Sequence, residues 1–346
     1  MSQVPSFVEL KADGVQLIIA LTSGTPVVLH WGSNLGSGLD FEQLNLASQD
    51  AVPHADLDDH INPGIWREDA RGFHGRPALQ GHRSGQDWSQ LFEIEKVVSD
   101  ATSIAITSVD RAAQLEVAAT FTISPAGILS ITQSVKNLAG KDFSLNELVT
   151  WLPLADYATE TMDFTGRWVK ERQPQRREIQ VGTWSREIRE GRSGHDYTIV
   201  QLAMTKDADY QRGEVWSMGL QWSGNTRHIV EKMNTGRTAI GAGELLLPGE
   251  VILAAGETYV APTVVSAYSN EGIDGITDRH YRWLRARRNH PSVVRPRPLT
   301  LNVWEAVYFD HNLEKLTQLA DVAQSIGVER FVLDDGWFGA RRNDLR

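Results

Sequence analysis

Residues 299–339 decide the fold, and they read LTLNVWEAVYFDHNLEKLTQLADVAQSIGVERFVLDDGWFG. Their apolar pattern predicts a strand from Leu299 to Phe309, an amphipathic helix from Asn312 to Ile326 and a second strand from Glu329 to Leu333. Strand, helix and strand in so short a stretch form a βαβ unit, in which the two strands are parallel. Two strands and one helix bury too little surface to close a barrel or to form a core alone.

The predicted helix has recognisable ends. Asn312 is a suitable N-cap, and Gly327 is a suitable residue for the left-handed conformation that follows many helices. Between them, apolar residues recur at helical spacing: Leu313, Leu316, Leu319, Ala320, Ala323 and Ile326.

Two carboxylates and a tryptophan follow the second strand, as Asp334-Asp335-Gly336-Trp337. In α/β folds ligands bind at the carboxyl ends of parallel strands. Neighbours in sequence are too close together to flank a bond from opposite sides, as the two carboxyl groups of a retaining glycosidase do. We therefore assign Asp334 and Asp335 to binding, because ionised carboxylates accept hydrogen bonds and a sugar offers neighbouring hydroxyl donors. Trp337 could close such a pocket against the sugar ring.

Two other interpretations of the acidic pair remain open. Asp-Gly is a strong turn signal, so the pair could form a solvated turn. A metal site with Asp310 as a third ligand is the other alternative.

Trp304 lies near the carboxyl end of the first predicted strand, at the same edge of the sheet as Asp334 and Asp335. It can share a pocket with the carboxylates, or it can be a buried packing residue. Glu305, beside it, is not expected to be a catalytic acid.

Residues 1–270 are β-rich and predict a large antiparallel β-sandwich. Short apolar or alternating runs are separated by turn residues, at Val15–Leu21, Trp88–Ile94, Leu115–Phe121, Ile128–Val135, Glu214–Trp222, Arg227–Met233 and Thr258–Val265. Residues 54–77 are polar and rich in Gly and Pro, which predicts a long loop whose role stays open.

Residues 271–298 predict a helix followed by an extended linker. Gly275–Arg288 has helical periodicity and a cationic last turn. Three prolines follow at positions 291, 296 and 298, and we expect them to prevent a helix there. The mainly β domain therefore ends near residue 270, and residues 299–346 form a separate α/β domain.

Composition excludes several classes of protein. The net charge of −10 over 346 residues argues against a nucleic-acid partner, which needs a basic surface. The absence of cysteine excludes disulfides and thiolate chemistry. No apolar stretch approaches the length of a membrane span, and the first ten residues do not resemble a secretion signal. We therefore expect a cytoplasmic protein without a membrane partner.

The two motifs of the α/β stretch resemble the barrel entry of the family 36 glycoside hydrolases, which are mainly α-galactosidases. The motifs are Asn302-x-Trp-Glu-Ala-x-Tyr-Phe-Asp310 and Gly327-Val-Glu-Arg-Phe-Val-Leu-Asp-Asp-Gly-Trp-Phe-Gly339. The resemblance implies a β-supersandwich like that of galactose mutarotase, a (β/α)₈ barrel and retaining hydrolysis of terminal α-galactosides such as melibiose or raffinose-type sugars. It implies no cofactor and a homo-oligomer, commonly a tetramer. It assigns Asp334 and Asp335 to the galactose hydroxyls and Trp304 to the border of the sugar pocket.

One departure from the family pattern matters. The family's nucleophilic Asp lies in a Lys-x-Asp pattern on a later strand, and its acid/base Asp lies later still; neither position occurs in these 346 residues. We therefore expect an N-terminal fragment of a longer enzyme, without catalytic residues and inactive alone. The alternatives are a non-catalytic carbohydrate-binding module, or a family member with α-N-acetylgalactosaminidase or galactosyl-transfer activity.

Overall fold

The computed structural model describes residues 4–49, 63–197, 200–289 and 291–337. The chain forms two compact units, Met1–Leu284 and Arg285–Arg346. The expected loop at residues 54–77 lies partly outside the described residues, as do Phe338 and Gly339 of the second motif.

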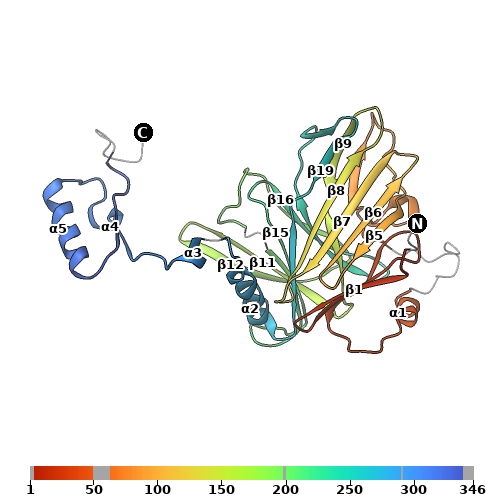
Figure 1. Cartoon of the computed structure of the whole chain (residues 1–346), viewed down its shortest axis with the longest axis horizontal. Coiled ribbons are helices and arrows are strands. Elements are labelled where there is room, and N and C mark those ends of the chain that lie inside the picture. Colours follow the sequence, from red (N-terminus) through yellow and green to blue (C-terminus); the bar gives the residue numbers. More distant parts are fainter. Residues whose placement is uncertain (1–3, 50–62, 198–199, 290, 338–346) are drawn as a thin grey trace. The chain divides into compact units, whose positions relative to one another are not determined.

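The largest sheet of the first unit has ten strands among the described residues: β5 (Glu93–Ser99), β6 (Ser103–Asp110), β7 (Leu115–Ile123), β8 (Leu129–Asn137), β11 (Ala158–Arg167), β12 (Lys170–Glu178), β14 (Val200–Thr205), β15 (Val215–Leu220), β19 (Thr258–Val260) and β20 (Val264–Ser269). Their order is β12-β11-β14-β15-β20-β8-β7-β6-β5, and β19 pairs with β8. All these pairings are antiparallel, and β5 to β8 lie side by side in chain order (Figure 1).

Three smaller antiparallel sheets complete the strands that the structure describes in this unit. One contains β1 (Phe7–Ala12), β2 (Val15–Ala20) and β3 (Val27–Ser33). A second has the order β10 (Thr150–Leu154), β17 (Thr238–Glu244), β16 (Thr226–Lys232) and β13 (Gly182–Ile188). A third has the order β18 (Val251–Leu253), β9 (Phe143–Leu148) and β4 (Leu79–His82).

Alternation along the strands explains why these sheets stack. In β8 every second side chain is buried, as the period of two in a strand requires. The buried faces of all four sheets contribute to one hydrophobic core, which includes Leu17, Phe121, Phe143, Leu152 and Trp216. The prediction of a mainly β, antiparallel sandwich is confirmed.

Two of the predicted strands were wrong in extent. The expected strand at Trp88–Ile94 begins only at Glu93, because upstream backbone donors are taken by side chains: Leu91 N donates to Asp110 (2.7 Å) and Phe92 N donates to Glu68 (2.6 Å). The expected strand at Thr258–Val265 is two strands, β19 and β20, which pair with different parts of β8.

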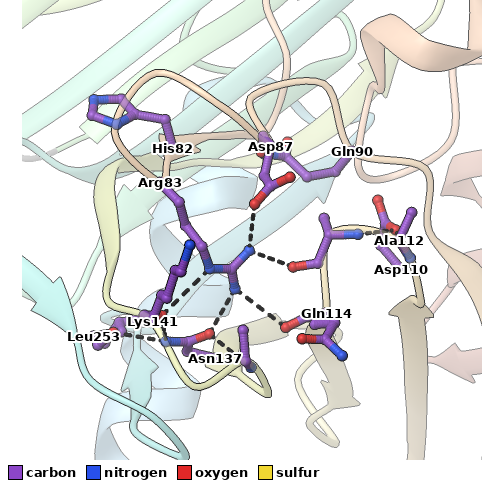
Figure 2. A network of polar contacts seen from close by, with 12 residues as sticks. His82, Arg83, Asp87, Gln90, Asp110, Ala112, Gln114, Asn137, Lys141 and Leu253 are labelled. Carbon is purple, nitrogen blue, oxygen red and sulfur yellow. Dashed lines mark hydrogen bonds and ion pairs between the residues drawn. The ribbon is translucent and has the colours of Figure 1, made fainter.

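A buried arginine ties the loop after β4 to the end of the large sheet. Figure 2 shows the guanidinium of Arg83 surrounded by acceptors from several segments. It donates to Asn137 Oδ1 (2.6 Å), to Asp87 Oδ2 (2.9 Å) and to the backbone carbonyl of Ala113. Arg83 is 8% exposed and lies 5.2 Å from the ring centre of Phe143. A buried charge with this many partners fixes the positions of the segments that hold it.

The described residues of the first unit include three helical segments: α1 (Phe41–Ala47), the 3₁₀ turn η1 (Asp69–Arg71) and α2 (Gly272–Arg285). Asp40 caps α1 by accepting hydrogen bonds from two backbone amides of its first turn. The predicted helix within residues 271–298 is α2, which packs on the first unit through buried Ile276. Arg279 also donates to Asp13 at 2.7 Å.

The second unit contains the predicted βαβ arrangement. β21 (Thr300–Asn302) and β22 (Arg330–Val332) are parallel, and α5 (Leu313–Ser325) connects them. Asn312 caps α5 by accepting a hydrogen bond of 2.9 Å from Lys315 N, and Gly327 has a φ of 82°. Both predicted helix ends are confirmed.

The first strand of this unit is much shorter than expected. β21 ends at Asn302, and a helical turn, α4 (Trp304–Val307), replaces the predicted extension to Phe309. The Asn302 side chain accepts from Trp304 N at 2.8 Å, which turns the backbone away from the sheet. The expectation that the prolines prevent a helix was also wrong, because Pro291 begins a single turn, α3 (Pro291–Val294). Proline is tolerated at the first helical position, where its missing N–H has no partner to lose.

Candidate functional site

The candidate site lies where β21 and β22 both end. Asn302 is opposite Val332 in the parallel register, so the residues that follow each strand come out at the same edge. Asp334 is two residues beyond Val332, and Trp304 is two residues beyond Asn302. The topology therefore brings these side chains to one place although thirty residues of chain separate them.

Asn302 holds the two halves of this edge together. Its Nδ2 donates to Asp334 Oδ2 at 2.5 Å, while its Oδ1 accepts from Trp304 N at 2.8 Å. One amide side chain thus fixes both the carboxylate of Asp334 and the start of the turn that carries Trp304.

The carboxylate of Asp334 is kept ionised by its neighbours. The hydrogen bond from Asn302 lowers its pKa below the ordinary value, and the backbone N–H of Asp335, which donates at 2.8 Å, lowers it further. His311 contributes a smaller favourable charge interaction. An ionised, half-buried carboxylate can accept hydrogen bonds from ligand hydroxyls.

Asp335 and Gly336 form a turn, as the Asp-Gly signal predicts, but this turn follows a parallel strand. Asp335 is exposed, whereas Gly336 is buried with a φ of 104°. A Cβ at Gly336 would lie 3.2 Å from the ring of Phe309 and 3.3 Å from Nε2 of His311. Glycine is therefore required here both by the backbone and by the close approach of two rings.

Trp304 stands half-buried at the first position of α4. Its ring meets Tyr308 at 5.3 Å and Phe309 at 5.2 Å between centroids, both edge to face. Such packing fixes the orientation of the indole. Trp337, the other predicted aromatic residue, is 67% exposed and follows the turn directly.

Asn302, which sequence reasoning did not single out, donates to Asp334 Oδ2 and accepts from the backbone N–H of Trp304. His311 was missed as well; its Nε2 is buried and has no hydrogen-bond partner among the described residues. The sequence does contain a signal for Asn302: an Asn ends the first of the two parallel strands, and an Asp follows the end of the second. Nothing in the sequence marks His311, because its position depends on how the α4–α5 connection folds back.

The metal interpretation gains no support from the described residues. Asp310 pairs with Lys315 Nζ at 3.3 Å, and no group of three or more potential ligands occurs in the part of the chain that the structure describes. None of the described helices has the length and hydropathy that a membrane span requires.

The comparison with known families shows to which family the chain belongs. Residues 24–254 match the glycosyl hydrolase family 36 N-terminal domain, and residues 258–346 match melibiase. The chain belongs to glycosyl hydrolase family 36. The family resemblance read from the two motifs is confirmed, and so is the assignment to the glycoside hydrolases.

Relatives and solved structures agree with the family. An α-galactosidase of Escherichia coli is 34% identical over 341 residues, which are 99% of this family 36 chain and 48% of that protein. AgaA of Geobacillus stearothermophilus, also an α-galactosidase, is 35% identical over 195 residues, 56% of this chain and 26% of that protein.

The crystal structure of AgaB from the same organism has the same fold, with a TM-score of 0.85 at 24% identity, over 99% of this chain and 50% of that one. A structure of an AgaA variant in complex with raffinose has a TM-score of 0.81 at 23% identity and covers 96% of this chain and 50% of that one. This family 36 chain therefore spans about half the length of the E. coli protein and of AgaB.

Proposed function

We propose that the protein recognises terminal α-galactosides and that its family 36 activity is their retaining hydrolysis. Asp334 and Asp335 hold hydroxyl groups of the galactosyl ring, while Trp304 and Trp337 border it. The observation that carries this proposal is the hydrogen bond from Asn302 to Asp334, which fixes an ionised carboxylate at the carboxyl ends of two parallel strands.

The relatives support the choice of sugar. Variants of AgaA have been crystallised in complex with raffinose and with stachyose. We extend that ligand class to this chain because the matched region includes both motifs of the site. Association into a homo-oligomer, a tetramer by the same resemblance, is part of the proposal, and sedimentation velocity tests it.

These 346 residues by themselves are proposed to bind the sugar without cleaving it. Asp334 and Asp335 are adjacent in sequence, and Asp335 N donates to Asp334, so the two carboxylates cannot act as nucleophile and acid on opposite sides of a glycosidic bond. We therefore expect no release of phenol from an aryl α-galactoside above the uncatalysed rate.

The test measures binding and hydrolysis with the same preparation. Isothermal titration with methyl α-D-galactoside should give saturable binding, and methyl α-D-glucoside, its epimer at C4, should bind more weakly. Asp334→Asn and Asp335→Asn should each weaken binding about 10-fold or more, because each removes a charge-assisted acceptor. Asp321→Asn, an exposed carboxylate on α5, is the matched control and should change nothing.

Two results would contradict the proposal. If the Asp334→Asn variant binds the sugar as tightly as the unaltered chain, the carboxylate of Asp334 does not contribute to the binding site. Hydrolysis that copurifies with the 346-residue chain would show that catalysis does not need the residues that the family pattern places later.

A further inference from the structure

A cavity of about 470 Å³ lies in the first unit, and no residue of the candidate site at Asp334 lines it. Among the described residues, segments that are far apart in sequence form its walls: β3 with His30, Ala47 to Gln49, the stretch at 63–67 with Phe73, the end of β10 with Tyr157, and the residues from Glu231 to Ala239. Its size is within the range of cavities that hold small ligands, roughly 300–1,000 Å³.

The floor of this cavity is built around a buried arginine. Arg67 is 5% exposed, and its guanidinium lies 4.1 Å from the ring centre of Trp151 and 4.5 Å from that of Phe73. It is ion-paired with Glu231, which also accepts from Arg76 N at 3.0 Å. The backbone of Arg67 has a φ of 51°, a left-handed conformation that a non-glycine residue keeps only where its surroundings impose it.

The rim offers an aromatic surface. Tyr157 is 56% exposed, and its hydroxyl donates to Glu214 Oε2 at 3.3 Å. Its ring lies 6.1 Å from that of Trp216, which is buried. An exposed ring held at both its edge and its hydroxyl is a suitable platform for the C–H face of a sugar.

His30 adds a polar group to the wall. Its Nε2 lies 2.7 Å from the carbonyl of Ser33, so an N–H at this position leaves Nδ1 as an acceptor. Burial lowers the pKa of His30, which keeps the ring neutral at pH 7.

The charges of the lining indicate a neutral ligand. Among the lining residues that the structure describes, two arginines, Arg67 and Arg237, are balanced by two carboxylates, Glu231 and Asp156. Arg67 is engaged by Glu231, and Arg237 Nη2 donates to the carbonyl of Ser48 at 2.8 Å. Charges that balance within this described part of the lining give an anion no advantage, whereas hydrogen-bonding groups beside an exposed ring suit a polyhydroxylated molecule.

We propose that this cavity is a second carbohydrate site, which binds a neutral mono- or disaccharide independently of the carboxylates at Asp334. The proposal does not rest on the galactoside site, because every described residue that lines the cavity belongs to the first unit.

Saturation-transfer NMR and isothermal titration with the 346-residue chain test the proposal. The probes are methyl α-D-galactoside, raffinose and maltose, with inorganic phosphate as the anionic control. The Asp334→Asn background weakens the galactoside site about 10-fold, so that saccharide binding which remains there and is weakened further by a substitution in the cavity belongs to the cavity. In that background Tyr157→Ala should weaken the remaining binding about 3- to 10-fold through loss of the aromatic platform.

Tyr210→Ala is the matched control, because Tyr210 is 55% exposed and does not line the cavity. It should leave the affinity within about twofold, as expected for a surface change away from the site. His30→Gln provides a second variant and should also weaken binding, with an unchanged thermal midpoint showing that the fold is retained.

Three outcomes would overturn the proposal. The first is the absence of saturable binding of all three saccharides in the Asp334→Asn background. The second is equal affinity of Tyr157→Ala and Tyr210→Ala. The third is displacement of the sugar by phosphate, which would identify the cavity as an anion site instead.

Discussion

Asn302 Nδ2 and Asp334 Oδ2 are 2.5 Å apart, and this hydrogen bond joins the ends of two parallel strands that α5 separates in sequence. The same Asn302 side chain accepts from Trp304 N at 2.8 Å. Its amide therefore determines where the carboxylate and the aromatic residue of the proposed galactoside site stand relative to each other.

Replacing Asn302 by Ala should raise the pKa of Asp334. In the unaltered chain the hydrogen bond from Asn302 stabilises the ionised form, so the carboxylate stays charged below its ordinary pKa of 3.8. Because the pKa of Asp334 is lowered, the interactions of its ionised carboxylate are fully present above the ordinary pKa. They are lost as the pH falls through the lowered pKa. Titration of the Asp334 carboxyl carbon by ¹³C NMR measures both values, with Asp321 as the exposed reference.

Sugar binding should follow the same titration. In the unaltered chain the affinity for galactosides should decrease on acidification only below pH 3.8. In the Asn302→Ala variant the decrease should begin at a higher pH. A decrease that begins at the same pH after the substitution would mean that Asp334 does not control binding.

Arg83→Met should destabilise the first unit by about 2–4 kcal/mol, because the substitution takes the Arg83 donor from the carbonyl of Ala113 and leaves Asn137 Oδ1 with the N–H of Ala139 as its donor. Arg111→Met is the matched control, since Arg111 is an 80% exposed partner of Glu95 and such pairs contribute about 0–1 kcal/mol. Urea unfolding followed by tryptophan fluorescence measures the difference between the two variants. If Arg83→Met lowers the free energy of unfolding no more than Arg111→Met does, the hydrogen-bond network in Figure 2 does not stabilise the first unit.

Glu231→Gln should destabilise the first unit by about 3–5 kcal/mol, because it leaves the guanidinium of Arg67 buried without a counter-charge. The double variant Arg67→Met with Glu231→Gln should be more stable than Glu231→Gln alone, since no unpaired charge remains. Thermal unfolding of four chains, the unaltered one, Arg67→Met, Glu231→Gln and the double variant, gives the coupling energy. If the double variant loses at least as much stability as the two single variants together, the ion pair between Arg67 and Glu231 is not the source of the destabilisation.

The second unit should be cut by proteases before the first. Among the described residues from 285 to 337, only Val303, Val307, Ala323 and Gly336 are buried. Leu313 is 84% exposed and Ile326 is 68% exposed, although both belong to the apolar pattern of α5. Brief digestion with subtilisin and mass spectrometry should therefore find the first cuts after residue 285. Equal resistance of both units would show that the apolar side of α5 is covered in solution, for example by another copy of the chain.

Local signals predicted much of this protein. The alternation along β8 predicted a strand with one buried face, and Asn312 and Gly327 marked both ends of α5 because capping depends only on neighbouring backbone groups. The order of strand, helix and strand also predicted that the ends of β21 and β22 would meet, since a βαβ connection makes its strands parallel.

Other features depended on contacts between distant residues. The strand expected to reach Phe309 stops at Asn302, where one side chain bonds both the next turn and a carboxylate from the other strand. The strand expected from Trp88 begins at Glu93 because Asp110 and Glu68 take the intervening backbone donors. No propensity scale contains such bonds, because their partners are far away along the chain.

The two classes of architecture, the parallel pair of strands and the position of Asp334 and Trp304 at one edge follow from the amino-acid order alone, because hydrophobic period and capping are properties of neighbouring residues. Three relationships follow from the folded chain instead: Asn302 links that pair, His311 approaches the turn, and Arg67 and Tyr157 border a cavity in the sandwich. These relationships arise when sheets pack and segments distant in sequence share a dry environment, where each buried polar group must find its partner.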